Sequence, residues 1–153
     1  MKFKPRSAGI AAMLTGASLI AAVAQEKGRN VASAQREVLL VTTQSWNGKP
    51  YTHYPTGQPQ LTTIKVTIPP HTALPWHTHP FPNSAYVLSG TITLHDRDSG
   101  KTLVMHQGQA FGESVDTAHR GESGDETVVL LVTYAGTPGI PPSIPTKGEK
   151  EEY

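Results

Sequence analysis

Short stretches of this chain alternate between apolar and polar residues, and this period of two is typical of β-strands with one buried face. The stretch 61–68 is the clearest case: isoleucine or valine occupies positions 64, 66 and 68, and threonine or lysine occupies 63, 65 and 67. The stretch Thr91–Asp96 repeats the alternation, and Lys101–His106 follows after the polar turn 96–100. This order predicts an antiparallel hairpin.

Further strands are predicted where apolar runs lie between turns rich in glycine, proline, serine or aspartate. They are Tyr86–Leu88, which ends at Ser89-Gly90, then Gly108–Glu113, Thr127–Tyr134 and the run Val38–Val41 within 36–45. No stretch after residue 24 has a convincing helical period. Short strands separated by turns at this interval favour an all-β fold, an antiparallel sandwich or jelly-roll barrel.

The first 24 residues have the pattern of a secretory leader. Lys2, Lys4 and Arg6 precede the small, alanine-rich apolar stretch 8–23, and Ala-Val-Ala at 22–24 fits the small-x-small cleavage rule. The alternative is an uncleaved membrane anchor, but the apolar run is short and contains threonine, glycine and serine. We therefore expect a signal peptide at 1–24, a periplasmic or secreted protein, and no membrane association after cleavage.

The rest of the chain divides by composition. Residues 25–36 are polar and predict a linker, and residues 37–136 hold the predicted strands of a single domain. Residues 137–153 are rich in proline and then in charge, which predicts an extended tail with a disordered finish.

Composition also excludes several classes of function. Removing the leader lowers the number of lysines and arginines from 13 to 10 against 12 acidic residues, so the mature chain has a formal charge near −2. Without a basic block, a nucleic-acid partner is not expected. The chain has no cysteine, which excludes a disulfide scaffold and a thiolate metal site.

Three histidines form a candidate metal site. His77 and His79 are two residues apart, and in an extended strand this spacing sends both imidazoles to the same face. Imidazole is a common metal ligand near neutral pH because it is then largely uncharged. His119 follows the later predicted strand and turn, where it could join the pair. Two incidental strand histidines are the alternative interpretation of His77 and His79.

These residues and their spacing resemble the two motifs of the cupin superfamily. In the first motif, His77 and His79 take the histidine positions, Asn83 stands where a glutamate is usual, Gly90 closes the motif, and the opening glycine is absent. In the second motif Gly108 and His119 fit at full spacing. Serine at 114 and aspartate at 116 replace the usual proline and glycine. The resemblance covers roughly residues 37–136 and implies an antiparallel double-stranded β-helix.

The asparagine leaves the candidate site without its usual carboxylate. An amide oxygen is a poorer ligand for a hard divalent ion, so either the site has three histidines alone or another carboxylate replaces the missing one. Glu113 shares the strand parity of Phe111, and a strand that buries Phe111 should turn Glu113 inward as well. The alternative is an exposed glutamate at a twisted strand end.

The resemblance implies that His77, His79 and His119 hold a divalent metal ion, with iron, manganese, nickel and zinc all compatible. The strand parity adds Glu113 as the candidate fourth ligand. Cupins of this size include dioxygenases, isomerases and lyases, so we expect a small-molecule metalloenzyme. The alternative is a non-catalytic periplasmic module that binds a small ligand or a metal. The family also implies a homodimer, because small one-domain cupins often pair through edge strands.

The leader generates the first prediction. Because the small-x-small motif ends at Ala24, the mature protein should begin at Gln25. N-terminal sequencing of the protein from the native envelope fraction checks this. An intact Met1 in that fraction would contradict a cleaved leader.

Overall fold

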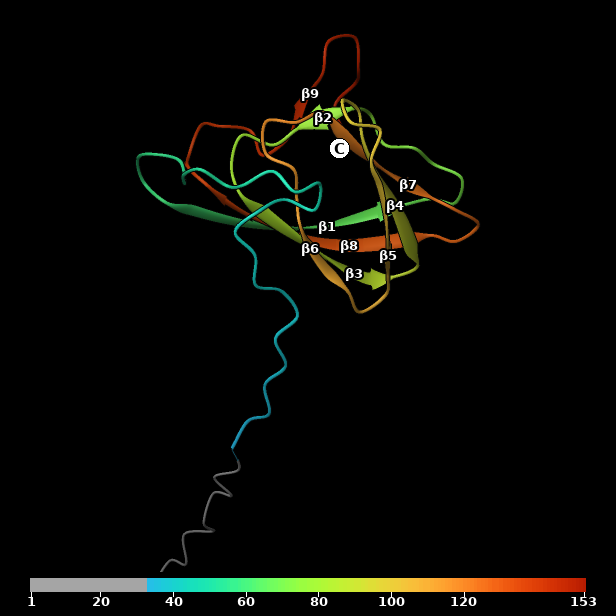
Figure 1. Cartoon of the computed structure of the whole chain (residues 1–153), viewed down its shortest axis with the longest axis horizontal. Helices are drawn as coiled ribbons and strands as arrows, with labels where there is room; N and C mark the ends of the chain where they lie inside the picture. The colour runs from blue at the N-terminus through green and yellow to red at the C-terminus, as the bar shows by residue number, and fades with distance from the viewer. Residues whose placement is uncertain (1–32) are drawn as a thin grey trace, which may run out of the picture. The chain divides into compact units, whose positions relative to one another are not determined.

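The computed structural model describes residues 33–153, so the leader 1–24 and most of the linker 25–36 lie outside the described residues. Within that range the unit Arg36–Tyr153 contains nine β-strands (Figure 1). They are β1 (Gln60–Ile68), β2 (His77–Thr78), β3 (Asn83–Ser89), β4 (Thr91–Asp96), β5 (Thr102–His106), β6 (Ala110–Gly112), β7 (His119–Ser123), β8 (Val128–Gly136) and β9 (Ile144–Pro145). Residues 33–153 include no helix that is long and apolar enough to cross a membrane.

The strands form two antiparallel sheets. One sheet has the order β1-β8-β3-β6, and the other has the order β5-β4-β7-β2-β9. Most neighbours are distant in sequence: β1 pairs with β8 along its whole length, from Gln60↔Gly136 to Ile68↔Val128. Two antiparallel sheets with such long-range pairing define a jelly roll, and the predicted all-β fold is confirmed.

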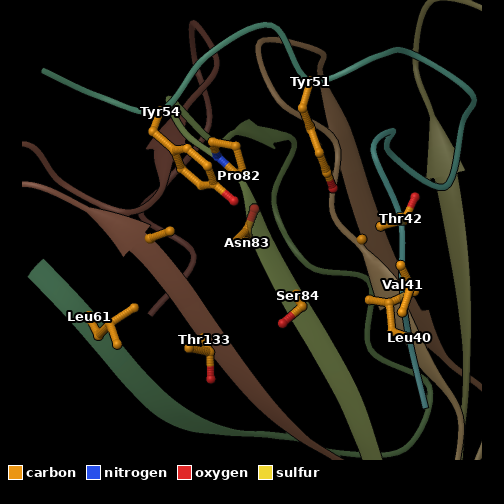
Figure 2. Close-up of a pocket in the computed structure, with 12 residues that line it drawn as sticks. Leu40, Val41, Thr42, Tyr51, Tyr54, Leu61, Pro82, Asn83, Ser84 and Thr133 are labelled. Carbon is orange, nitrogen blue, oxygen red and sulfur yellow. The ribbon is translucent and has the colours of Figure 1, made fainter. Parts of the chain in front are cut away.

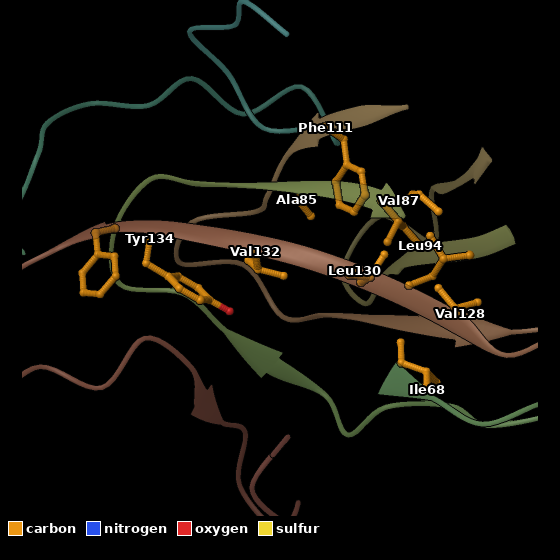
Figure 3. Packing of buried hydrophobic residues seen from close by; sticks show 11 residues of the cluster. Ile68, Ala85, Val87, Leu94, Phe111, Val128, Leu130, Val132 and Tyr134 are labelled. Carbon is orange, nitrogen blue, oxygen red and sulfur yellow. The ribbon is translucent and has the colours of Figure 1, made fainter. Parts of the chain in front are cut away.

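Alternate residues of strands from both sheets build the hydrophobic core (Figure 3). Every second residue of β8 is buried, which turns Val128, Leu130 and Val132 inward. Ile92 and Leu94 of β4 join the same cluster from the other sheet. The period of two in the sequence therefore marks the buried face of each strand.

The predicted hairpin is confirmed, because β4 and β5 pair in register from Thr91↔His106 to His95↔Thr102. The turn before β4 requires a glycine. Gly90 has φ of +79°, and a Cβ at this position would lie 2.6 Å from the carbonyl oxygen of Thr127. Only glycine adopts this conformation without strain and leaves room for the backbone that leads into β8.

The prediction of a buried strand within 36–45 is wrong. Residues 33–42 belong to no strand, and Val38, Leu39 and Val41 are 59%, 49% and 87% exposed. The run Val38–Val41 lacks the alternation that assigns one face to the core. Neither sheet supplies it with a partner strand, and a strand needs one to satisfy its backbone groups.

The proline-rich segment after β8 packs against the sheet. Its strand β9 pairs with β2 through His77↔Pro145 and Thr78↔Ile144. The backbone N–H of Thr146 donates a hydrogen bond to the carbonyl of Trp76 at 2.9 Å. Proline in this segment therefore did not prevent it from packing, because β2 offers an open strand edge.

Candidate metal centre

The pairing of β2 with β7 brings the three predicted histidines together. His77 and His119 are cross-strand partners. His79 lies two residues further along and forms a bridge with Val115, just before β7. All three are at least 97% buried, with exposed fractions of 3%, 1% and 1% for His77, His79 and His119. The predicted convergence of three imidazoles is confirmed, and we call these residues the three-histidine cluster.

The rings of the cluster are arranged with nearly threefold regularity. Their centroids are 4.9 Å apart for His77 and His79, 4.5 Å for His77 and His119, and 4.9 Å for His79 and His119. The ring planes meet at 62°, 60° and 58° in the same order. One nitrogen from each ring lies within 4.8 Å of the others. Three imidazoles so placed can ligate one face of a single metal ion.

Backbone carbonyls orient all three rings. The Nδ1 atom of His77 lies 2.8 Å from the carbonyl oxygen of Pro75, and that of His119 lies 2.8 Å from the carbonyl of Thr117. The Nδ1 atom of His79 lies 2.7 Å from the carbonyl of Pro142. A carbonyl only accepts, so each Nδ1 carries a hydrogen, and in the neutral form of each ring the Nε2 presents a lone pair. Such bonds fix the tautomer that a metal requires.

Burial keeps two members of the cluster neutral. Removal from water, together with the nearby His119, lowers the pKa of His77 to about 4. Burial likewise lowers the pKa of His79 to about 3. Both imidazoles are therefore uncharged at neutral pH, which is the state that binds metal.

Glu113 follows β6 and turns inward, as its shared parity with Phe111 predicted. It is 7% exposed, and its Oε2 atom lies 3.4 Å from Nε2 of His119. Its backbone N–H donates to the carbonyl of Asn83, and its own carbonyl accepts a hydrogen bond from the Tyr51 hydroxyl at 2.9 Å. A Cβ at Gly112 would lie 2.5 Å from that hydroxyl, so glycine at 112 leaves room for the Tyr51 side chain that holds the Glu113 backbone.

Glu113 and His119 form a coupled pair. Burial alone would raise the pKa of the Glu113 carboxyl, but the adjacent His119 side chain and the other imidazoles of the cluster lower it. Burial likewise opposes charge on His119, yet the adjacent carboxylate raises the pKa of this imidazole. A cation at this point, whether a proton or a metal ion, is favoured by the carboxylate.

A second carboxylate reaches the cluster from the segment after β9. The side chain of Glu152 is 8% exposed, and its Oε2 lies 3.3 Å from Nε2 of His77. The Ser143 hydroxyl donates to the same oxygen at 2.7 Å. Burial raises the pKa of Glu152 to about 7. Sequence reasoning missed this residue, because a glutamate in a charged run carries no signal of burial.

The donors around the cluster fit a metal ion. Three imidazole rings and two carboxyl groups face one another here, and the Nε2 of His119 and the Oε2 of Glu113 are buried with no hydrogen-bond partner within residues 33–153. They line a cavity of about 20 Å³. Facing lone pairs in a dry space repel unless a cation lies among them.

Asn83 does not share this cavity. It lines a separate cavity of about 400 Å³, together with Tyr51, Tyr54 and the exposed Leu61 (Figure 2). The side-chain oxygen and nitrogen of Asn83 are buried without a hydrogen-bond partner in the described part of the chain. Of the two candidates for the missing carboxylate position, Glu113 alone faces the cluster.

The other histidines lie outside the cluster, as their absence from both motifs predicted. His71 is exposed and lies 3.7 Å from the carboxylate of Asp125, and His95 faces Glu122 at 3.4 Å. His106 lies beside the hydroxyl of Thr91 in the hairpin. Each of these histidines contacts one partner, and none of them belongs to a group of three metal-ligating side chains among residues 33–153.

Comparison with known proteins places the fold in a family. The family model described as "Cupin domain" (Cupin_2) matches residues 64–134. This range includes all three histidines of the cluster and Glu113. The chain therefore contains a cupin domain, and the resemblance read from the two motifs is confirmed.

Solved structures agree with this fold. The DMSP lyase DddQ from Ruegeria pomeroyi DSS-3 aligns with a TM-score of 0.52 at 19% identity, over 68% of this chain and 49% of that chain. The polyketide cyclase RemF from Streptomyces resistomycificus aligns with a TM-score of 0.50 at 24% identity, over 60% of this chain and 63% of that chain. This chain thus spans about half to two thirds of their length, and the likeness shows the fold. No curated protein sequence matches the chain.

The carbonyl contacts generate a prediction about tautomers. In the metal-free protein, His77 and His79 should stay neutral with the hydrogen on Nδ1 from pH 8 down to pH 5, because burial holds both pKa values near or below 4. Long-range ¹H–¹⁵N NMR spectra of the imidazoles measure this. His53 and His71, which are exposed, provide the internal comparison. Protonation of His77 or His79 near pH 6.5 would contradict the assignment.

Proposed function

We propose that the three-histidine cluster and Glu113 bind one divalent metal ion and that the protein is an exported small-molecule metalloenzyme of the cupin type. The observation that carries this proposal is the set of three Nδ1–carbonyl hydrogen bonds. They point three Nε2 lone pairs at one place, where the Glu113 carboxylate lies 3.4 Å from His119.

The donor set decides which ions fit. Imidazole suits iron, manganese, nickel and zinc, and one carboxylate beside three imidazoles leaves these choices open. When bound, such an ion supplies Lewis acidity, and iron or manganese also supplies redox chemistry. The chain's own residues hold the ion and exclude water, since Ile92, Leu94 and Leu130 wall the cavity.

A small-molecule reaction of the dioxygenase, isomerase or lyase type agrees with the size of the domain and the buried position of the cluster. Two of the structures with the same fold carry the names of a lyase and a cyclase. At 19% and 24% identity these names do not transfer to this chain. The proposed periplasmic or secreted location rests on the leader pattern at 1–24.

A second candidate function has its own supporting observation. The cavity at the cluster has a volume of about 20 Å³, which is enough for about one water molecule. A site so closed favours a module that holds a metal ion without turnover. Oxygen-uptake and product assays on small phenols, diketones and organic acids separate the two functions, because only the enzyme consumes a substrate.

Loss of a histidine should remove the metal. The full chain, purified without a histidine tag, should contain about one divalent ion per molecule. The His77→Ala and His119→Ala variants should each lose most of it, because two imidazoles cannot replace the ligand set. Elemental analysis measures the content, and circular dichroism checks that the sheets remain folded. The matched control is His95→Ala, which removes a histidine outside the cluster; unchanged metal in both cluster variants would overturn the proposal.

Glu113, rather than Asn83, should supply the negative charge of the site. The Glu113→Gln variant should bind a divalent ion on the order of ten- to a hundredfold more weakly, the scale of losing an important metal-site contact. Asn83→Ala should change the affinity much less, because Asn83 does not line the cavity at the cluster. Calorimetric titration of zinc into both metal-free variants compares them. If Asn83→Ala is the weaker binder, the assignment of Glu113 is wrong.

A further inference from the structure

The segment after β8 folds back over the three-histidine cluster in two parts, which we call the inner limb (141–146) and the outer limb (149–153). The inner limb is built into the sheet: β9 pairs with β2, and the carbonyl of Pro142 accepts the Nδ1 hydrogen of His79. Arg97 also donates to the hydroxyl of Thr146 at 3.1 Å. This limb helps to orient a ligand ring and belongs to the permanent structure of the site.

The outer limb is held by fewer contacts. The N–H of Glu149 donates to the carbonyl of Thr146, and the hydroxyls of Tyr153 and Tyr134 lie 2.7 Å apart. Its remaining bond joins Glu152 to Ser143 of the inner limb. Residues of both limbs line a cavity of about 290 Å³. Opening the outer limb therefore breaks a small number of contacts and leaves β9 intact.

Glu152 is the single residue of the two limbs that lines the cavity at the cluster. Its Oε2 atom lies 3.3 Å from Nε2 of His77, and no lysine or arginine within residues 33–153 forms an ion pair with it. Because Nδ1 of His77 bonds to the carbonyl of Pro75, its Nε2 is an acceptor that faces an acceptor. A buried carboxyl group in this setting must either take up a proton or have a cation beside it, and a metal ion at the cluster would supply that cation.

The outer limb also leaves no room for a substrate. With Glu152 in place, the cavity holds about one water molecule. Departure of Glu152, which lines this cavity, would open space beside the cluster for a ligand of several heavy atoms. The carboxyl group of Glu152 already occupies this space, and it accepts a hydrogen bond from the Ser143 hydroxyl at 2.7 Å.

We propose that Glu152 occupies the ligand position of the metal centre as an internal substitute, and that the external ligand of this site is a small carboxylate anion that displaces it. This inference rests on the proposed function, since it requires the metal ion. Departure of the outer limb frees the hydroxyls of Ser143 and Tyr134, which lose their partners Glu152 and Tyr153. Two freed O–H donors beside a cation suit a carboxylate, which accepts hydrogen bonds and carries one negative charge.

Competition between the limb and the ligand has a measurable consequence. A tethered group acts at a high effective concentration and therefore occupies the site most of the time. The apparent Kd of an external ligand equals its intrinsic Kd divided by the fraction of molecules whose site is open. Removal of the Glu152 carboxylate should strengthen the binding of a small carboxylate on the order of tenfold or more. It should do so without changing the ligands that the sheets provide.

The experiment uses the full chain loaded with Co(II), whose visible spectrum reports the ligands of the ion. Acetate is titrated as the probe, and acetamide, which has the same shape and no charge, is the control ligand. The variant is Glu152→Ala, and the matched control is Glu151→Ala, which removes the exposed neighbouring carboxylate. We expect acetate to change the spectrum at a concentration at least about tenfold lower in Glu152→Ala than in the wild type and Glu151→Ala. Acetamide should have no effect.

Hydrogen exchange supplies a readout of the limb itself. Acetate should speed amide exchange in residues 149–153 of the wild-type protein, while the inner limb and β2 stay protected. Equal acetate affinity in the wild type and Glu152→Ala would overturn the inference. Loss of Co(II) from Glu152→Ala that acetate does not restore would also overturn it, since Glu152 would then be a permanent ligand. Failure of the wild type to bind Co(II) would instead overturn the proposed function.

Discussion

Three hydrogen bonds from histidine Nδ1 atoms to backbone carbonyls are the interaction on which this site depends. Each carbonyl belongs to a different part of the chain: Pro75 precedes β2, Thr117 precedes β7, and Pro142 lies in the inner limb. A carbonyl cannot donate, so it fixes both the rotation and the tautomer of its ring. The three lone pairs therefore converge because the backbone is folded, before any metal is bound.

Charge balance explains the two glutamates beside the cluster. With neutral imidazoles and both Glu113 and Glu152 ionised, the group would carry a charge of about −2, which the proposed divalent cation would neutralise. The two acids come from very different structural contexts. Glu113 follows β6 and is held through its own backbone by Tyr51, whereas Glu152 lies on a segment with few attachments. The first is suited to permanent binding and the second to exchange.

The position of the carboxylate also differs from the usual pattern of the cupin motif. Asparagine at 83 leaves the usual position without a charge, and its amide lies at a separate cavity. Glu113 approaches His119 from the neighbouring strand, because β3 and β6 pair in register from Ser84↔Gly112. The carboxylate beside the cluster therefore comes from the end of β6, whereas the usual motif position lies at the start of the adjacent strand β3.

The sequence by itself determined the strands with clear alternation, the β4–β5 hairpin and the identity of the three histidines, because a period of two and fixed spacing are local properties. Its parity with Phe111 predicted an inward Glu113, with an exposed strand end as the alternative. Tertiary structure alone decided the exposure of Val38–Val41 and the burial of Glu152, since both depend on which strand edges are available. It likewise supplied the carbonyl of Pro142 to His79, 63 residues away. Contacts between residues so far apart leave no periodic trace in the sequence.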